Sequence, residues 1–379
     1  MARRPRFLEY YRQFEALSPE EDSARRMARR DEARSRALAV TPVLDLSRPE
    51  WHEPPDPEIV NAATFALRRA LNRYPDAGGG AARAAVARRH EVPETQVALG
   101  HGAAQLLQAA LRELASGGEV VLPWPSWTPL PALAARAGAT PVPVELDPAG
   151  LVDVDALITA AQGASVRAVI LCSPNDPTGA VVELGEIRRL AGALRERTVL
   201  LLDEALVDFV GEEASAAAIV SELPNTIVFR SFSKAFALAG LRAGYAVGPP
   251  ELAETLGRMT PGLGVASPTL AAMATALDPN DRAVRRMRKR RAAAATERDR
   301  LAEALRGTPY STAPSRSCYV WMSCEGLGGA AISRGLDEAR IVVAPGADWG
   351  DEDHIRITLR DKPATERLAS ALRALLDHR

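Results

Sequence analysis

The feature that most limits the possible folds is a series of short apolar runs that alternate with helical patterns between about residues 77 and 250. The apolar runs cover residues 118–123, 166–173, 197–205, 225–231 and 244–248. The helical patterns between them cover residues 103–115, 129–137, 184–196 and 213–222. Apolar character that is continuous rather than alternating indicates strands covered on both faces, which is typical of mostly parallel sheets. We therefore predict an α/β fold, a three-layer α/β/α sandwich whose ligands bind beyond the carboxyl ends of the strands.

The pattern differs on either side of this region, which indicates three parts of the chain. Residues 1–42 are rich in charge and predict a helical arm closed by Pro42. After Pro268, long helical patterns and short strands indicate a smaller α+β domain. The expected domains are the arm at 1–42, a small domain at 43–76 and 268–379, and a large domain at 77–267.

Charge and composition exclude several classes of protein. The chain has 47 basic and 48 acidic residues, so it lacks the general attraction to nucleic acid or anionic lipid of a strongly basic protein. The basic run at residues 285–291 is interpreted as the solvated face of a long helix. No apolar stretch approaches the length of a membrane span, and the five histidines and three cysteines form no metal-ligand pattern. We expect a cytoplasmic protein with no nucleic acid, membrane or metal partner.

Polar segments follow four of the predicted strands or open the helices behind them. They are residues 100–104, 173–179, 203–205 and 231–242. The glycines of the first segment leave backbone N–H groups free to hold a phosphate at a helix N-terminus. Asp203 ends a buried strand, where a carboxylate needs a cationic partner such as a protonated ring nitrogen.

The fourth segment contains Lys234, one of only three lysines in the chain. The other two, Lys289 and Lys362, lie in a basic helical run and just before the last helix. A neighbouring cation and partial burial lower the pKa of a lysine and favour the free amine that a Schiff base requires. A lysine, a carboxylate and an anion cradle together predict a site for pyridoxal 5′-phosphate.

From about residue 43 onward the chain resembles the fold-type-I pyridoxal-phosphate aminotransferases of classes I and II, and it looks closest to the histidinol-phosphate aminotransferase-like branch. The resemblance rests on motifs in family order. They are GxGA at 100–103, PSW at 125–127, PNDPTG at 174–179, DEA at 203–205, SFSK at 231–234, GLRAGY at 240–245 and RIT at 356–358.

The resemblance implies a role for each matching residue. Lys234 corresponds to the lysine that binds the cofactor aldehyde and moves the substrate proton, and Asp203 to the partner of the pyridinium nitrogen. Trp127 corresponds to the aromatic residue that stacks on the cofactor ring. The implied phosphate ligands are Arg242, Ser231, Ser233 and the amides of Gly102, Ala103 and Ala104.

Two further matches concern the substrate and a second subunit. Arg356 resembles the arginine that clamps a substrate carboxylate. Tyr74 resembles the tyrosine that reaches the phosphate of a neighbouring subunit, which implies a homodimer with shared active sites.

Two departures from the family fall around the phenolic oxygen of the cofactor. Relatives have a tyrosine and an asparagine where this chain has Leu206 and Asp176. Asp176 must then be protonated, share the phenolic proton or point elsewhere, with Asn175 or water in its place. Asn175 is accordingly a candidate for cofactor and substrate binding.

Other departures weaken the match to enzymes that act on histidinol phosphate. Those enzymes usually have an arginine where this chain has Ala344, and an asparagine where it has Cys318. An Asn-Glu-Asn-Pro-like stretch is replaced by residues 46–49. The residues that could rebuild an anionic or side-chain pocket are Arg48, Trp51, Arg316 and Arg360.

The resulting hypothesis is an aminotransferase that moves an amino group between an α-amino acid, or a similar amine, and a 2-oxo acid. Three alternatives remain open. They are a histidinol-phosphate aminotransferase, a decarboxylase resembling the threonine-phosphate decarboxylases, and a non-catalytic protein that binds the cofactor.

Overall fold

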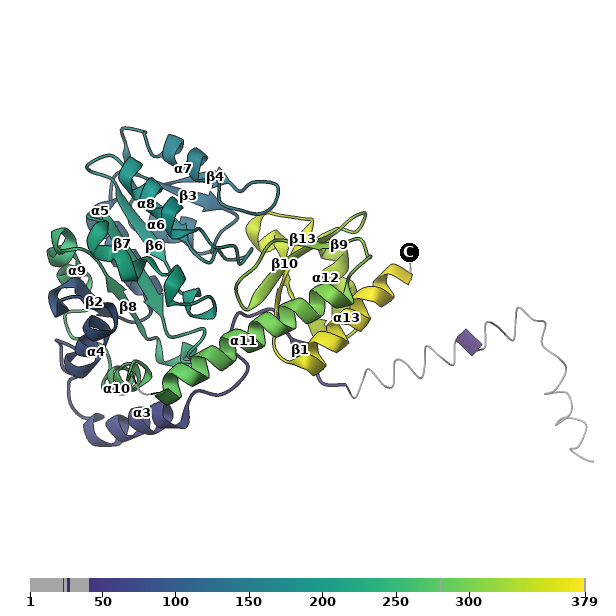
Figure 1. Cartoon of the computed structure of the whole chain (residues 1–379), viewed down its shortest axis with the longest axis horizontal. Coiled ribbons are helices and arrows are strands. Elements are labelled where there is room, and N and C mark those ends of the chain that lie inside the picture. The colour runs from purple at the N-terminus through teal and green to yellow at the C-terminus, as the bar shows by residue number, and fades with distance from the viewer. Residues whose placement is uncertain (1–22, 24–25, 28–40, 280, 378–379) are drawn as a thin grey trace, which may run out of the picture.

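The protein is described by a computed structural model that covers residues 23, 26–27, 41–279 and 281–377 (Figure 1). The helical arm expected at residues 1–42 therefore lies almost wholly outside the described residues. No helix of the described ranges is long and apolar enough to cross a membrane.

A mixed, mostly parallel sheet forms the centre of the large part of the molecule. In spatial order its strands are β2 (Val97–Gly100), β8 (Gly244–Val247), β7 (Thr226–Ser231), β6 (Val199–Asp203), β5 (Val166–Cys172), β3 (Glu119–Trp124) and β4 (Thr140–Glu145). Only β8 runs antiparallel to its neighbours. The predicted fold class is confirmed.

Both faces of this sheet are buried, and alternate side chains enter two separate cores. On β5, Val169 and Leu171 belong to one core, and Ala168 and Ile170 to the other. The first core is covered by α3 (Pro57–Ala70), α4 (Gly80–His90), α7 (Val154–Ala160), α8 (Leu184–Ala193) and α10 (Ser267–Ala276). The second is covered by α5 (Ala103–Leu114), α6 (Leu130–Arg136) and α9 (Ala253–Met259). Full burial of each large apolar side chain contributes about 1.5–3 kcal/mol, so the three layers hold the strand ends firmly in place.

A smaller unit follows along the chain. Its antiparallel sheet has the order β12 (Ala344–Pro345), β13 (His354–Thr358), β10 (Tyr319–Cys324) and β9 (Tyr310–Thr312). The short strand β1 (Leu44–Asp45) pairs in parallel with β11 (Ile341–Val342). The helices of this unit are α12 (Gly329–Glu338) and α13 (Lys362–Asp377), and Figure 1 shows the long α11 (Asp281–Ala304) running from the large unit to the small one.

Helix α3 packs against the large unit, whereas the sequence analysis assigned it to the small domain. Ile59 of α3 belongs to the core beneath the large sheet, and α3 packs against α10. Strand β1, in contrast, pairs within the small unit. We therefore propose one domain boundary between β1 and α3 and a second one after α10, later than the expected residue 268, because α10 packs in the core of the large unit.

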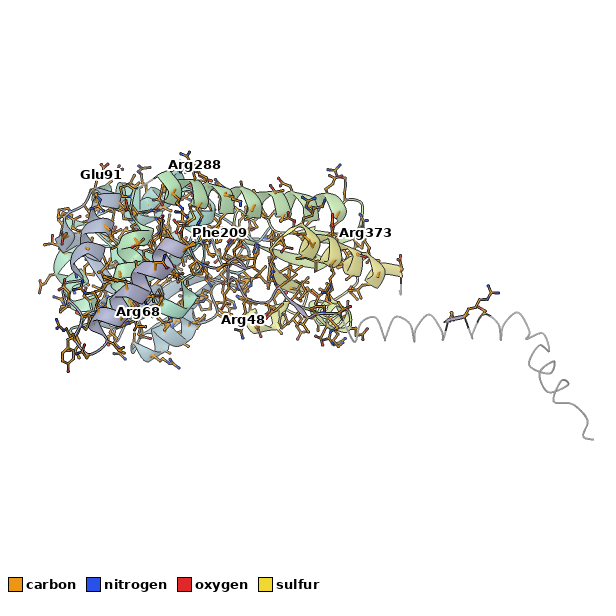
Figure 2. All side chains as sticks on the ribbon, turned by 90° about the horizontal axis from the view of Figure 1, so that it is seen from below. Arg48, Arg68, Glu91, Phe209, Arg288 and Arg373 are labelled. Carbon is orange, nitrogen blue, oxygen red and sulfur yellow. The ribbon has the colours of Figure 1, made fainter. Side chains whose placement is uncertain are left out.

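Helix α11 carries the basic run of the sequence. Figure 2 shows Arg288 on its outer side, and Lys289 is exposed as well. Arg290, on the inner side, is buried and donates hydrogen bonds to the carbonyl oxygens of Pro54 and Ala235. This helix therefore holds the loop that directly follows Lys234.

The α-helix expected at residues 213–222 is wrong. The segment instead forms two 3₁₀ turns, η3 (Glu212–Ala214) and η4 (Ala216–Glu222). The buried carboxylate of Glu204 accepts hydrogen bonds from the Ser215 hydroxyl and from the Ala216 amide at 2.6 Å. These side-chain bonds compete with a continuous helical ladder at this point.

Candidate active site

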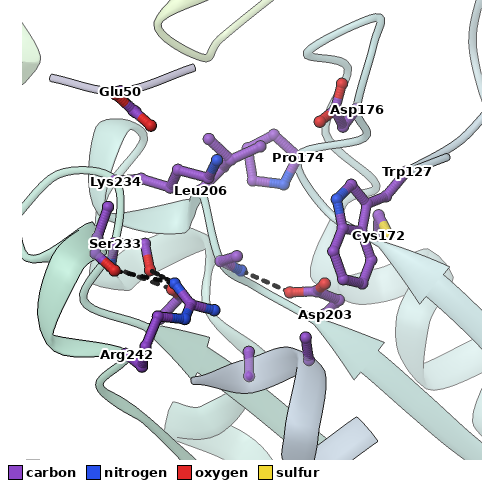
Figure 3. Close-up of a pocket in the computed structure, with 15 residues that line it drawn as sticks. Glu50, Trp127, Cys172, Pro174, Asp176, Asp203, Leu206, Ser233, Lys234 and Arg242 are labelled. Atoms are coloured by element: carbon purple, nitrogen blue, oxygen red, sulfur yellow. Dashed lines mark hydrogen bonds between the residues drawn. The ribbon is translucent and has the colours of Figure 1, made fainter. Parts of the chain in front are cut away.

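A cavity of about 190 Å³ lies where β5, β6 and β7 end. Cys172 pairs with Asp203 in the strand register, and Ser231 ends the next strand, so adjacent strands deliver these residues to one edge of the sheet. The cavity lining, shown in Figure 3, consists of Glu50, Ala103, Ala104, Trp127, Cys172, Pro174, Asp176, Asp203, Ala205, Leu206, Ser231, Ser233, Lys234, Ala239 and Arg242.

Lys234 follows β7 and points its amine into this cavity (Figure 3). Burial lowers the pKa of Lys234, and the cationic Arg356 adds to this effect, although the nearby Asp176 opposes it. A lowered pKa increases the fraction of free amine, which is the form that attacks a carbonyl carbon.

Asp203 is a buried carboxylic acid on the floor of the same cavity. One of its oxygens accepts a hydrogen bond of 2.9 Å from the Ala205 amide. Burial raises the pKa of Asp203 to about 6, against the lowering effects of that bond and of Lys234. A cation placed beside this carboxylate would remove much of the cost of burying its charge.

The first turn of α5 and the residues around Arg242 form an anion cradle. Gly102 has φ +85° and precedes the helix, so the first amides of α5 face the cavity edge at the positive end of the helix dipole. Arg242, itself at φ +50°, donates hydrogen bonds to the Ser233 hydroxyl at 3.3 Å and the Ala239 carbonyl at 3.0 Å. A Cβ added at Gly102 would lie 2.8 Å from the Arg242 guanidinium, so this approach needs a glycine.

Arg356 lines a second, adjoining cavity of about 450 Å³ that shares Trp127, Asp176 and Lys234 with the first. Its guanidinium packs over the rings of Trp349 and Tyr319, at 4.9 and 5.3 Å from the ring centres. Arg356 and Lys234 thus line the same cavity.

Asp176 and Asn175 take different directions from the same loop. Asp176 forms an ion pair of 2.6 Å with Arg356. Asn175 is fully buried away from the cavity, where its side chain bonds with Ser126 at 2.8 Å and the Pro125 carbonyl at 3.1 Å. Asp176 lines both cavities while its carboxylate pairs with Arg356, and its role toward the phenolic oxygen of the cofactor stays a prediction. The side chain of Asn175 does not take its place at the cavity.

Tyr74 lies apart from the other candidates. It is 87% exposed and does not line either cavity of this chain. Large exposed apolar side chains precede it, on helix α3 or just after it: Val60, Phe65, Leu67 and Leu71.

Glu50 is a wall residue that sequence reasoning missed. It lies beside Lys234 in Figure 3 and raises the pKa of that lysine, a minor effect against burial. Nothing in the segment around Glu50 resembles a strand-end motif, so only the folded chain reveals its position. Trp349, which lines the adjoining cavity, is a second wall residue that the sequence did not single out.

Comparison with known proteins agrees with this geometry. The model of the family "Aminotransferase class I and II" matches residues 41–372. The aromatic amino acid aminotransferase of Mycobacteroides abscessus is 34% identical over 327 residues, covering 84% of this chain and 89% of that protein. The histidinol-phosphate aminotransferase of Rubrobacter xylanophilus is 34% identical over 321 residues, covering 84% of this chain and 88% of that protein.

A solved structure gives the fold comparison. The histidinol-phosphate aminotransferase of Sinorhizobium meliloti, in complex with pyridoxal-5′-phosphate, superposes with a TM-score of 0.78 at 24% identity, covering 92% of this chain and 94% of that one. The chain belongs to the class I and II aminotransferases. It is a pyridoxal-phosphate-dependent enzyme that moves an amino group between an amino acid, or a similar amine, and a 2-oxo acid.

Proposed function

We propose that the cavity around Lys234 is the site of transamination and that the amino donor carries an apolar side chain. The observation that supports the site most strongly is the convergence of Lys234, Asp203 and Arg242 on one cavity. These residues are separated in sequence by up to 39 positions, and the sheet edge brings together the amine, the carboxylate and the guanidinium.

The residues present fit pyridoxal phosphate. Ser231, Ser233, Arg242 and the first amides of α5 would hold its phosphate, and Asp203 would pair with its ring nitrogen. The close approach of the Arg242 guanidinium to the backbone of Gly102 supports the phosphate assignment, because a side chain at Gly102 would collide with Arg242. The bound cofactor supplies a ring that stabilises negative charge at the substrate Cα.

Each wall residue then has a task in the reaction. Lys234 holds the cofactor aldehyde and, once released, removes and returns the proton at the substrate Cα as base and acid. Asp203 keeps the ring nitrogen protonated, and Trp127 covers the cofactor ring. Leu206 is 5% exposed and offers no hydrogen bond to the phenolic oxygen of the cofactor.

The second cavity argues against a donor that carries a phosphate. Its walls combine the apolar Val343, Ala344, Pro345 and Trp349 with polar residues such as Asp348, and Ala344 stands where an arginine would serve histidinol phosphate. The arginines that could rebuild an anionic pocket, Arg48, Arg316 and Arg360, are absent from the walls of both cavities described above. A donor without a phosphate is therefore favoured over histidinol phosphate, and the relatives named aromatic amino acid aminotransferases support an apolar side chain.

We also propose a cytoplasmic homodimer. Tyr74 is exposed on this chain, which suits a residue that reaches into a neighbouring active site, and α3 offers Phe65 at 62% exposure as part of an interface. The three cysteines of the chain are free and buried, as expected for a reducing compartment.

A half-reaction screen tests the proposed function. The cofactor-loaded enzyme is mixed with single amines, and the visible absorbance of the bound cofactor is followed. We expect amines with apolar side chains to discharge the absorbance and to leave pyridoxamine phosphate, while histidinol phosphate does not.

Two outcomes of the screen would contradict the proposal. Release of carbon dioxide without pyridoxamine phosphate would indicate a decarboxylase. Absence of any change with all amines would indicate a protein that only binds the cofactor.

A further inference from the structure

The arginine expected to receive a substrate carboxylate already has a carboxylate partner within the chain. Arg356 and Asp176 are 7% and 6% exposed, and they form an ion pair of 2.6 Å. Arg356 also donates a hydrogen bond of 2.8 Å to the carbonyl oxygen of Ser47. Burial opposes the charged form of Arg356, yet Asp176 and Tyr319 leave its pKa raised.

Asp176 is held in this position by its own loop. The neighbouring Asn175 bonds through its side chain to Ser126 and Pro125 and through its backbone to Ala180 at 2.8 Å and Gly179 at 2.7 Å. Tyr319 donates a hydrogen bond of 3.2 Å to the Asn175 carbonyl. These contacts hold the loop backbone beside Asp176, and the Asp176 carboxylate accepts a hydrogen bond from Arg356.

A second carboxylate at Arg356 would meet an unfavourable charge balance. The guanidinium carries one positive charge, and Asp176 already supplies one negative charge in the same buried place. An added α-carboxylate would put two like charges beside one cation where water screens them poorly. Trp349 and Tyr319 on the other side of the guanidinium contribute ring faces and no further cation.

A neutral group meets no such conflict. Of the five N–H groups of the Arg356 guanidinium, one on Nη1 donates to Asp176 and one on Nη2 donates to Ser47, so a further N–H at these ends remains as a donor for a polar oxygen. A hydroxyl on the substrate could accept from this donor without bringing charge.

We propose that Asp176 is a specificity-determining residue that makes the Arg356 end of the site favour amines with a neutral polar group, such as hydroxymethyl, over an α-carboxylate. The inference rests on the proposed function, since it places the substrate Cα between Lys234 and Arg356. Substrates with a carboxylate, including 2-oxo acid acceptors, still bind, but Asp176 weakens their binding.

Matched ligands test this assignment on the cofactor-loaded enzyme. The non-reacting pair is 3-phenylpropanoate and 3-phenylpropan-1-ol, with dissociation constants measured by calorimetry. The reacting pair is phenylalanine and phenylalaninol, with half-reaction rates followed by absorbance. The variants are Asp176→Asn, which keeps the shape and removes the charge, and Glu50→Gln, which removes the same charge from a wall position that is not paired with Arg356.

We expect Asp176→Asn to tighten binding of the carboxylate at least about tenfold, equivalent to about 1.4 kcal/mol, and to change the alcohol by less than about twofold. Glu50→Gln should leave the ratio of the two dissociation constants close to that of the wild type. An unchanged ratio in Asp176→Asn would overturn the proposal.

The unmodified enzyme gives a second, independent outcome. It should bind the alcohol at least as tightly as the carboxylate, and a clear preference for the carboxylate would overturn the proposal even if Asp176→Asn failed to fold. If neither phenylalanine nor phenylalaninol reacts, the proposed function is in doubt, while the two dissociation constants still report on Asp176.

Discussion

Two buried titratable residues in the active-site cavity have pKa values displaced in opposite directions. Burial lowers the pKa of Lys234 and raises that of Asp203 to about 6. Both shifts favour the neutral form, because each charge loses its hydration when it is buried. At the scale of single residues, Lys234 is therefore more readily the free amine that attacks a carbonyl carbon, and the Asp203 carboxylate would be stabilised by a cation beside it.

Substitution of Lys234 tests the first of these roles. Lys234→Arg keeps a cation but cannot form the Schiff base, and Lys234→Ala removes the group altogether. We expect both variants to lose transamination by about 10²–10⁴-fold or more, the range for a missing acid–base group. Borohydride reduction and mass spectrometry should locate the cofactor on Lys234 of the wild type, and transamination retained by Lys234→Ala would contradict the mechanism.

Substitution of Asp203 tests the cost of its burial in protein stripped of cofactor. A raised folded pKa means that the folded state holds its proton up to about pH 6, whereas the unfolded chain releases it near pH 4. The free energy of unfolding of the wild type therefore falls as pH rises across this window and stays lower above it. Asp203→Asn escapes this loss and should be more stable at pH 8, by about 3 kcal/mol at about 1.4 kcal/mol per pKa unit.

Urea unfolding of both cofactor-free proteins between pH 5 and 8 measures this difference. The stability gain of Asp203→Asn should grow from pH 5 to about pH 7 and then level off. A gain that is constant over this range would show that burial of the charge is not its source. In the loaded enzyme the same variant should bind the cofactor more weakly, because its amide cannot neutralise the ring nitrogen.

The sequence distinguished some site residues better than others. Lys234 could be singled out because the chain has only three lysines, and Asp203 because it ends a continuous apolar strand. Asn175 and Asp176 could not be told apart, since their directions depend on Ser126, which binds one of them, and on Arg356, which binds the other. Those partners are distant in sequence, so only the folded chain assigns each side chain to its side of the loop.

At the scale of elements, the anion cradle depends on how closely β8 approaches the start of α5. A Cβ added at Gly244 would lie 2.6 Å from the backbone carbonyl carbon of Gly102, and the backbone cannot yield as a side chain can. Gly244 therefore fixes the distance between the strand and the helix that carries the phosphate-facing amides.

Gly244→Ala should weaken cofactor binding at least about tenfold by pushing β8 away from α5, a cost of about 1.4 kcal/mol or more. Gly240→Ala is the matched control, because it lies four residues away and a Cβ there meets nothing within 4 Å. Titration of the cofactor-free variants with pyridoxal phosphate, followed by absorbance, gives both affinities. Equal affinities would mean that the close approach does not shape the cradle.

Element prediction failed where tertiary contacts override local pattern. The sequence analysis named no strand at β4, which contains Pro141 and Pro143; β4 lies at the sheet edge, where prolines are tolerated. The helix expected at 213–222 gave way to 3₁₀ turns because Glu204 captures the Ser215 hydroxyl and the Ala216 amide. The strands that carry the site were predictable, since they are buried on both faces.

At the scale of the whole molecule, one chain accounts for every proposed contact to the cofactor except that of Tyr74. This residue is 87% exposed and follows α3, whose Phe65 and Leu67 are exposed as well. A tyrosine on this surface can reach a phosphate only in a second subunit. The proposed dimer therefore predicts that each active site combines Lys234 of one chain with Tyr74 of the other.

Complementation between a weakened variant and an inactive one tests this arrangement. Tyr74→Ala alone should reduce transamination by about tenfold or more, the value of about 1.4 kcal/mol for a lost hydrogen bond to a charged phosphate. Lys234→Ala should be inactive.

In a hybrid dimer of the two variants, one site carries both changes and the other carries neither, because each chain contributes its tyrosine to the site of the other chain. After unfolding and refolding together, random pairing should restore about a quarter of the wild-type activity. Separately tagged chains allow the hybrid to be purified, and a purified hybrid no more active than the Tyr74→Ala homodimer would mean that Tyr74 does not serve the neighbouring site.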